Sequence, residues 1–237
     1  MASKGVQGVE RFRDSLPIVR RVLDKGHFQL EDLMGGDAAV IRGARICYQS
    51  EATSPEADVR LIRRLMASEP KHNTVFEHAV FRFGIKCPLF VARQWHRHRI
   101  GSFNEKSLRY CIADREYYVP ADVSAGREEY TAHMEASYDL YDSLLKAGWQ
   151  PERARGVLGT AVYTEFIWTV NAWSFMNWLT KRLDKHAQWE HRQYAEAALD
   201  IFQQVMPVTA KAFIDSVLTP VLGYQAPDRD DIAPQQG

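Results

Sequence analysis

The densest group of chemically capable side chains lies between residues 93 and 110. The charged residues of this segment are Arg93, Arg97, Arg99, Glu105, Lys106 and Arg109. Five positive charges against one negative charge give the segment a net charge of +4, whereas the whole chain has 30 basic and 30 acidic residues and a formal net charge of zero. Guanidinium groups pair in a bidentate manner with phosphate oxygens, and hydroxyl groups add neutral donors. The segment, which also contains Ser102, Asn104 and Ser107, therefore predicts a local site for a compact anion such as a nucleotide phosphate.

A solvated basic face is the simpler interpretation of any such cluster. Here the arginines are interleaved with Trp95, Phe103 and Tyr110, and a Ser-x-Arg follows them, which favours phosphate binding. His96 and His98 are two residues apart, too close to share one helix face, and no Cys/His cluster accompanies them. We therefore predict no metal site.

The segment also resembles the signature of a known family. Arg97-His98-Arg99, followed after seven residues by Ser107, is similar to the motif of flavin-dependent thymidylate synthases. Those enzymes make dTMP from dUMP with FAD, a reduced nicotinamide and methylenetetrahydrofolate. The segments at 72–78 (HNTVFEH), 88–95 (PLFVARQW), 168–171 (WTVN) and 182–190 also look like this family, and the resemblance runs from about residue 23 to residue 206.

The resemblance implies FAD as cofactor, NADPH and methylenetetrahydrofolate as co-substrates, and a set of site residues. The dUMP-binding role falls on Gln94, Trp95, His96, Arg97, Glu105, Lys106, Ser107, Leu108, Arg109, Arg155 and Arg182. The FAD-binding role falls on Thr74, Arg97, His98, Arg99, Glu105, Asn171, Trp173 and Asn177. The catalytic role falls on Arg182, whose permanent charge can stabilise negative charge that develops on the N3–C4 side of the uracil ring.

Some of these residues have other interpretations. Arg155 and Arg182 could be ordinary surface arginines, and Asn171 and Asn177 could be helix caps. Trp173 departs from the family, which usually has an arginine there that contacts the flavin. An indole can stack on an aromatic ring or on adenine, but it cannot pair with a phosphate.

The hydrophobic periodicity predicts a mixture of helices and strands. Helices are expected from Ser54-Pro55 onward, over 88–97, over 128–146, from Pro151 onward and over 187–206, and strands over 81–87 and 160–169. There is no regular βαβ alternation and no G-x-G-x-x-G, and Gly35-Gly36 indicates only a turn. The pattern indicates an α+β fold. The resemblance implies one compact domain of mixed helices and antiparallel sheet, like that of the thymidylate synthase complementing proteins, assembled as a homotetramer with active sites where subunits meet.

Composition limits the remaining function classes. The chain has 237 residues, 46% of them hydrophobic, and no apolar run long enough to span a bilayer or act as a signal peptide. We expect a cytoplasmic domain at 23–225, an N-terminal extension at 1–22 and a polar tail at 226–237. The first fifteen residues and the tail are expected to be loosely held. Neither a membrane nor a nucleic acid is expected as partner.

Three other functions compete with the flavin enzyme. A thymidylate synthase that uses a cysteine nucleophile would need an activated Cys47, Cys87 or Cys111, and the residues around them do not suggest one. A nucleic-acid-binding groove would suit the basic aromatic segment, but the zero net charge disfavours it. A metal-dependent hydrolase lacks ligands.

Overall fold

The protein is built around one antiparallel sheet of five strands. The computed structural model describes residues 9–47, 49, 54–70 and 72–225. The strands, in their order across the sheet, are β1 (Ile18–Val22), β2 (Gly26–Met34), β3 (Val80–Pro88), β5 (Tyr163–Asn171) and β4 (Ser102–Glu105). All four pairings are antiparallel, which confirms the predicted α+β class.

The described chain also contains helices, which turns and irregular segments connect to the strands. They are α1 (Gly36–Ile46), α2 (Pro55–Ala67), α3 (Leu89–Trp95), α4 (Arg127–Lys146), α5 (Pro151–Ala154), α6 (Ala172–Arg182), α7 (Trp189–Val205), α8 (Pro207–Phe213) and α9 (Thr219–Leu222). Short 3₁₀ turns occupy Val9–Ser15, Thr74–His78 and Arg155–Val157, and a π turn occupies Ile214–Leu218. Within the described ranges, no helix combines the length and the apolar character that crossing a membrane requires.

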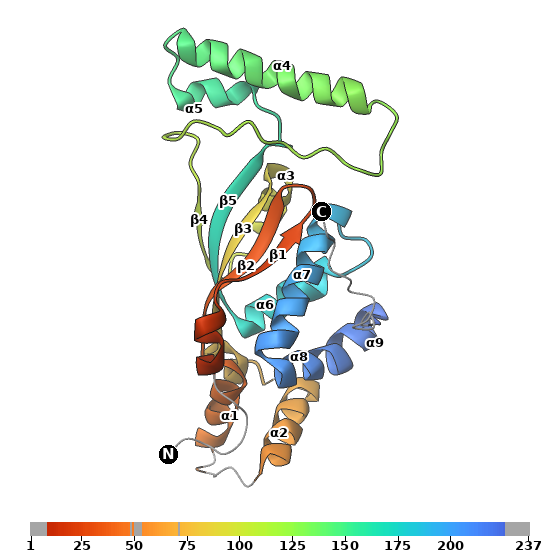
Figure 1. Ribbon diagram of the computed structural model, residues 1–237. Coiled ribbons are helices and arrows are strands. Elements are labelled where there is room, and N and C mark those ends of the chain that lie inside the picture. The colour runs from red at the N-terminus through yellow and green to blue at the C-terminus, as the bar shows by residue number, and fades with distance from the viewer. Residues whose placement is uncertain (1–8, 48, 50–53, 71, 226–237) are drawn as a thin grey trace.

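The main core lies between the sheet and helices α3, α6 and α7. Figure 1 shows α6, α7 and α8 grouped beside the sheet, with α1 and α2 at one end of the molecule and α4 and α5 at the other. Large aromatic side chains fill this core: the indoles of Trp95 and Trp178 stack with ring centroids 4.7 Å apart, and Trp168 meets both edge-on. A second, smaller cluster around Tyr138 and Met134 joins α4 to the end of β5.

Most of the elements predicted from periodicity are present. The strand predicted at 81–87 is β3, the one at 160–169 is β5, and the helices at 128–146 and 187–206 are α4 and α7. Ser54 caps α2, because its hydroxyl accepts a hydrogen bond from Ala57 N at 3.2 Å. The helix expected over 88–97 is shorter and ends at Trp95.

The sequence analysis did not find β1, β2, β4, α1 or α6. A register shift between Leu30 and Asp32 breaks the alternation of β2, and β4 is a polar edge strand of four residues. The sheet begins at Ile18, five residues before the domain boundary predicted at residue 23, and Phe12 of the preceding 3₁₀ turn packs against the core. The expectation that the first fifteen residues are loosely held is therefore wrong for the segment around Phe12, and residues 1–8 and 226–237 lie outside the described residues.

Gly101 controls the entry into β4, directly after the arginine-rich motif. Its φ of +155° is a conformation that other residues rarely adopt, and a Cβ there would lie 2.7 Å from Trp168 Nε1 and 3.0 Å from Thr169 O. The motif can turn into the edge strand only because this position has no side chain.

Replacing Gly101 by Ala should lower the free energy of unfolding by about 1–3 kcal/mol, because the backbone conformation and the contact with Trp168 are both strained. Urea unfolding monitored by circular dichroism measures this loss. Gly156→Ala is the matched control, because no atom lies within 4 Å of the Cβ built there. Equal stability of the two variants would contradict the proposed constraint.

Candidate active site

The arginine-rich motif begins at the end of a helix and finishes on an edge strand. The last turn of α3 continues through His96 N, which donates to Ala92 O at 3.0 Å, and His98 N, which donates to Trp95 O at 2.9 Å. The chain then enters β4, which pairs with β5 and leaves its other edge open. Arg97 and Arg99 are exposed in the connecting turn. This arrangement presents the arginine side chains to an incoming ligand.

Arg182, the predicted catalytic residue, lies against this motif. It is the last residue of α6, and its Nε donates to His98 Nε2 at 3.0 Å while its Nη2 donates to Gln94 O at 3.1 Å. The side chain of Gln94 donates in turn to Gln188 Oε1. Three of the predicted residues therefore form one contact group, in which a half-buried guanidinium is held by two acceptors.

Burial sets the charge state of this group. It lowers the pKa of His98 to about 4, with the neighbouring charges of Arg182 and Lys181 adding to the effect. The His98 ring is therefore neutral at neutral pH, and its Nε2 lone pair accepts from Arg182, which places the proton on Nδ1. Burial also lowers the pKa of Arg182 itself. Because His98 carries no charge, the positive charge at this end of α6 belongs to arginine and lysine.

The predicted phosphate-binding residues lie in a tight turn after β4. Ser107 O accepts from Tyr110 N at 3.0 Å and from Cys111 N at 3.1 Å, and Ser107 Oγ accepts from Arg109 N at 3.3 Å. Among the described residues, the exposed guanidinium of Arg109 forms a loose ion pair, at 3.4 Å, with the exposed Glu152 of α5 and lies over the ring of Tyr110. Exposed pairs of this kind contribute little to stability, so Arg109 can exchange Glu152 for a phosphate at small cost.

The other predicted dUMP residues are dispersed around the motif. Glu105 accepts from Thr164 Oγ1 at 2.7 Å, Lys106 pairs with Asp114 at 2.5 Å, and Leu108 is half-buried in the turn. Arg155 is exposed at the start of the 3₁₀ turn that follows α5. These side chains line the same end of the sheet, but no contact joins Arg155 to the motif among the described residues.

Trp95 and His96 do not face solvent as a binding residue would. The indole of Trp95 is fully buried, and the His96 ring packs edge-on against Phe103 and Phe166. The indole of Trp95 is therefore part of the core, and the dUMP-binding role of this position stays a prediction that its backbone would have to fulfil. The resemblance assigned Trp95 a binding role together with its neighbour Gln94. In the structure, however, the Trp95 side chain leaves the short helix α3 toward the core.

The predicted FAD residues divide between the two ends of α6. Asn171 caps the start of α6, accepting from Ser174 N at 2.8 Å, and Trp173 stacks on Phe76 of the 3₁₀ turn that carries Thr74. Asn177 is exposed farther along the helix. Along the axis of α6, Asn171 lies roughly 16 Å from Arg182, whereas Asn177 lies only five residues before Arg182. The capping interpretation is confirmed for Asn171, and the residues near the start of α6 are separated from the group of Arg182 and His98 by the length of the helix.

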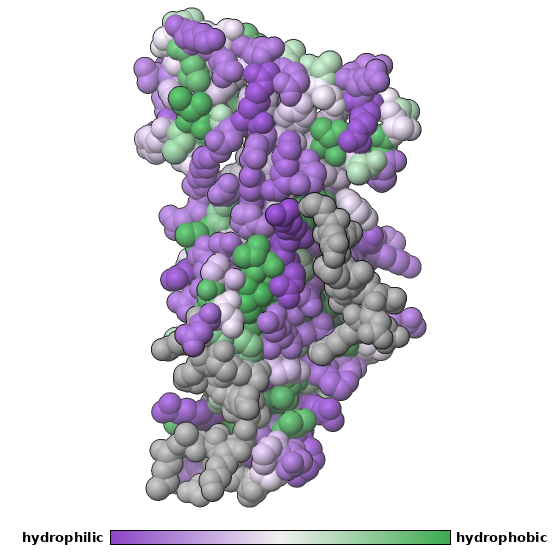
Figure 2. Space-filling view, in the orientation of Figure 1, coloured by the Kyte–Doolittle hydropathy of each residue, from purple (hydrophilic) through white to green (hydrophobic). Residues whose placement is uncertain are grey.

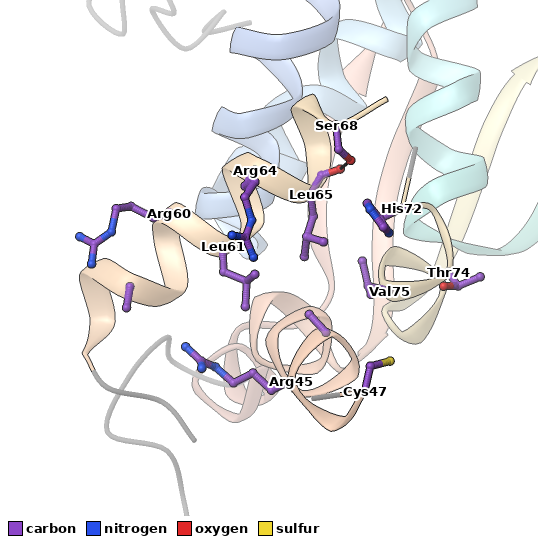
Figure 3. Close-up of a pocket in the computed structure, with 12 residues that line it drawn as sticks. Arg45, Cys47, Arg60, Leu61, Arg64, Leu65, Ser68, His72, Thr74 and Val75 are labelled. Atoms are coloured by element: carbon purple, nitrogen blue, oxygen red, sulfur yellow. Dashed lines mark hydrogen bonds between the residues drawn. The ribbon is translucent and has the colours of Figure 1, made fainter. Parts of the chain in front are cut away.

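A groove between α1 and α2 opens beside Thr74, and sequence reasoning missed it. Its volume is about 1010 Å³. Its lining includes Arg45, Arg60, Leu61, Arg64, Leu65, Ser68, His72, Thr74 and Val75. Figure 3 shows Arg64 and His72 directed into the space between the helices. No short pattern in the sequence indicates this groove, because only the packing of α1 against α2 turns the arginine-bearing face of α2 into a wall.

The neutral state of His98 makes stability depend on pH. Because its pKa is about 4 in the folded protein and near 6.5 when unfolded, the unfolded chain binds the proton more readily. The contribution is fully present above about pH 6.5 and is lost progressively as the pH falls toward about 4. In His98→Gln, the decrease in melting temperature between about pH 7 and about pH 5 should be smaller than in the wild type.

Melting curves over this pH range test the assignment. His191 and His27, whose pKa values burial also lowers, remain in both proteins and provide the common background. Identical pH dependence in the two proteins would mean that His98 titrates as an ordinary exposed histidine.

Comparisons with known proteins point to one family of enzymes. The sequence profile of a family described as thymidylate synthase complementing protein matches residues 29–208. A flavin-dependent thymidylate synthase of Thermosipho africanus is 44% identical over 214 residues, which cover 82% of this chain and 93% of that protein. One of the same description from Thermotoga neapolitana is 46% identical over 202 residues, with coverages of 81% and 93%.

A solved structure is similar as well. The UMP/dUMP methylase PolB from Streptomyces cacaoi, crystallised with 5-Br dUMP, superimposes with a TM-score of 0.74 at 28% identity, over 83% of this chain and 97% of that one. Sequence and fold therefore agree over the segment that carries the motif, Arg182 and the sheet. The chain belongs to the family of thymidylate synthase complementing proteins, the flavin-dependent thymidylate synthases.

Proposed function

We propose that this protein is a flavin-dependent thymidylate synthase, which methylates dUMP to dTMP with FAD as cofactor and with NADPH and methylenetetrahydrofolate as co-substrates. The relatives of 44–46% identity have this activity as their name, and the structural neighbour is a UMP/dUMP methylase. The observation that carries the proposal is the contact of Arg182 with His98 and with the carbonyl of Gln94, because it holds a cation at the family motif. The cytoplasm remains the predicted compartment.

The turn after β4 suits the nucleotide phosphate. Arg109 provides an exposed guanidinium, and the hydroxyl of Ser107 lies two residues before it. Charge-assisted hydrogen bonds from such groups hold phosphate oxygens tightly. We assign Arg155 and Lys106 to the same end of the substrate, as further sources of positive charge.

Arg182 is suited to contact the uracil ring of dUMP. Its guanidinium is held by two acceptors and is half-buried, so it does not need to be ordered when the substrate arrives. A fixed cation beside the uracil stabilises the negative charge that develops on its N3–C4 side, and the ring becomes a better nucleophile at C5.

The described residues also suit a flavin. The exposed amide of Asn177 and the exposed hydroxyl of Thr74 offer polar contacts, and the adjoining groove is both apolar and cationic. Bound FAD would supply the hydride transfer that the reaction needs, which is chemistry of the cofactor rather than of side chains. Arg97, Arg99 and Asn171 complete the set that we assign to holding it.

The cysteines give no support to the thiol-dependent alternative. Cys87 is fully buried in β3, and burial raises the pKa of its thiol well above the ordinary value. A buried, protonated thiol is a poor nucleophile. Cys47 and Cys111 are exposed, and neither has a hydrogen-bond partner that could act as a base among the described residues.

We propose that the active sites form between subunits of a homotetramer. Among the residues assigned to FAD, Thr74 and Asn171 lie near the start of α6, whereas His98 contacts Arg182 at its end. A second protomer would therefore have to place its arginine-rich motif beside Thr74 of the first. The end of the molecule formed by α4 and α5 has exposed apolar side chains, among them Tyr130, Leu140 and Trp149, and Figure 2 shows apolar patches there. Such patches commonly mark protein interfaces.

The function is tested by product formation. Purified protein supplied with FAD, NADPH, methylenetetrahydrofolate and dUMP should form dTMP, measured by liquid chromatography. Flavin reoxidation should depend on dUMP and on the folate together. A protein that takes up no FAD, or that forms no dTMP with all four present, would refute the assignment.

Arg109→Ala should weaken dUMP binding roughly ten- to a hundredfold, because a charge-assisted phosphate contact contributes about 1.5–3 kcal/mol. Isothermal titration calorimetry measures the affinity. Arg21→Ala is the control, since Arg21 is exposed on β1 at the opposite edge of the sheet. Equal affinities of the two variants would remove Arg109 from the substrate site.

A further inference from the structure

We propose that the groove between α1 and α2 binds the pyrophosphate-bearing half of FAD, and that Arg64 pairs with the phosphate oxygens. The inference rests on the proposed function, because it takes FAD as the cofactor. It names the residue that supplies positive charge in a chain where Trp173 stands at the position of the family's arginine.

The groove has the size and lining of a site for an extended nucleotide. Its volume of about 1010 Å³ lies at the upper end of the range found for small-molecule sites. Leu61 and Leu65 of α2 and Val75 of the following turn give it apolar walls. Polar and charged groups from α1, α2 and the segment around Thr74 complete the lining, and they can orient a ligand that the apolar walls contact.

Among the described residues, one arginine of the groove is both directed inward and without an ion pair. Arg45 pairs with the fully buried Asp58 at 2.5 Å, so its charge is already neutralised. Arg60 points away from the space between the helices, whereas Arg64 points into it (Figure 3). Arg64 is exposed and forms no ion pair with any described residue. An unpaired guanidinium in a partly apolar wall favours a bidentate anion such as a pyrophosphate.

The groove adjoins the residues assigned to the flavin. Thr74 lines it, and His72, two residues before Thr74, is directed into it. Trp173 stacks on Phe76 of that turn, with ring centroids 6.4 Å apart, so its indole is engaged in an aromatic contact. An indole has one donor and no charge, and it cannot replace a guanidinium at a phosphate. The missing charge must come from another element, and Arg64 is placed to supply it.

The affinity of the apoprotein for FAD tests this role. Quenching of flavin fluorescence should show that Arg64→Ala binds FAD about ten- to a hundredfold more weakly than the wild type, and Arg64→Lys should lose less. The affinity for riboflavin, which carries neither phosphate, should change little. Salt should weaken FAD binding less in Arg64→Ala than in the wild type, because one screened charge pair has been removed.

Arg63→Ala is the matched control. Arg63 is the adjacent residue on α2, is exposed and does not line the groove, so this variant removes the same charge without the contact. In Arg64→Ala, the further change Trp173→Arg should restore a large part of the FAD affinity by returning a cation to the family's position. Circular dichroism of each variant verifies the fold.

The outcomes separate this inference from the proposed function. If Arg64→Ala binds FAD as tightly as the wild type and forms dTMP, the groove assignment is wrong and the enzyme assignment stands. If Arg63→Ala loses as much affinity as Arg64→Ala, the effect is one of general charge and the assignment is again wrong. If the wild type binds no FAD, the groove assignment and the enzyme assignment are both wrong.

Discussion

The stacking of Trp95 on Trp178 is the contact on which the geometry of the site depends. Trp95 is the last residue of α3 and Trp178 lies in α6, so their contact at 4.7 Å fixes one helix against the other inside the core. Arg182 follows Trp178 by one helical turn, and Gln94 precedes Trp95 directly. The guanidinium of Arg182 therefore lies within hydrogen-bond distance of the Gln94 carbonyl. Aromatic pairs of this kind contribute about 0.5–1.5 kcal/mol beyond the burial of their area.

The same core explains why positive charge can accumulate beside the motif. Three basic side chains, Arg182, His98 and His191, lie near one another, and burial lowers the pKa of each. The two histidines give up their protons first, so repulsion within the group is removed and the arginine retains its charge. Trp178 Nε1 donates to His191 Nε2 at 3.3 Å, which requires that ring nitrogen to be unprotonated. The site thus keeps the charge of Arg182 without added positive charge from the two histidines.

The sequence predicted those parts of the structure that a short pattern determines. Alternation of buried side chains predicted β3, helical spacing predicted α4 and α7, and the motif indicated the turn that contacts Arg182. It did not predict β2, whose alternation is broken at the register shift, or the burial of Trp95, because a seven-residue helix shows no clear periodicity. The groove between α1 and α2 could not be predicted, since it is a consequence of how these two helices pack against each other.

Helix α6 has a distinct role at each end. At its start the Asn171 side chain satisfies the amide of Ser174, and the remaining amides of the first turn give that end a partial positive charge. At its end the carbonyl groups carry a partial negative charge, which favours the cation of Arg182 there. Compared with the arginine that the family usually has at this position, the indole of Trp173 lacks a full positive charge at the start of the helix. The helix dipole itself is unchanged. The helix can therefore tolerate the departure from the family at its first turn while Arg182 stays in place, and any further charge for a phosphate has to come from a neighbouring helix rather than from α6 itself.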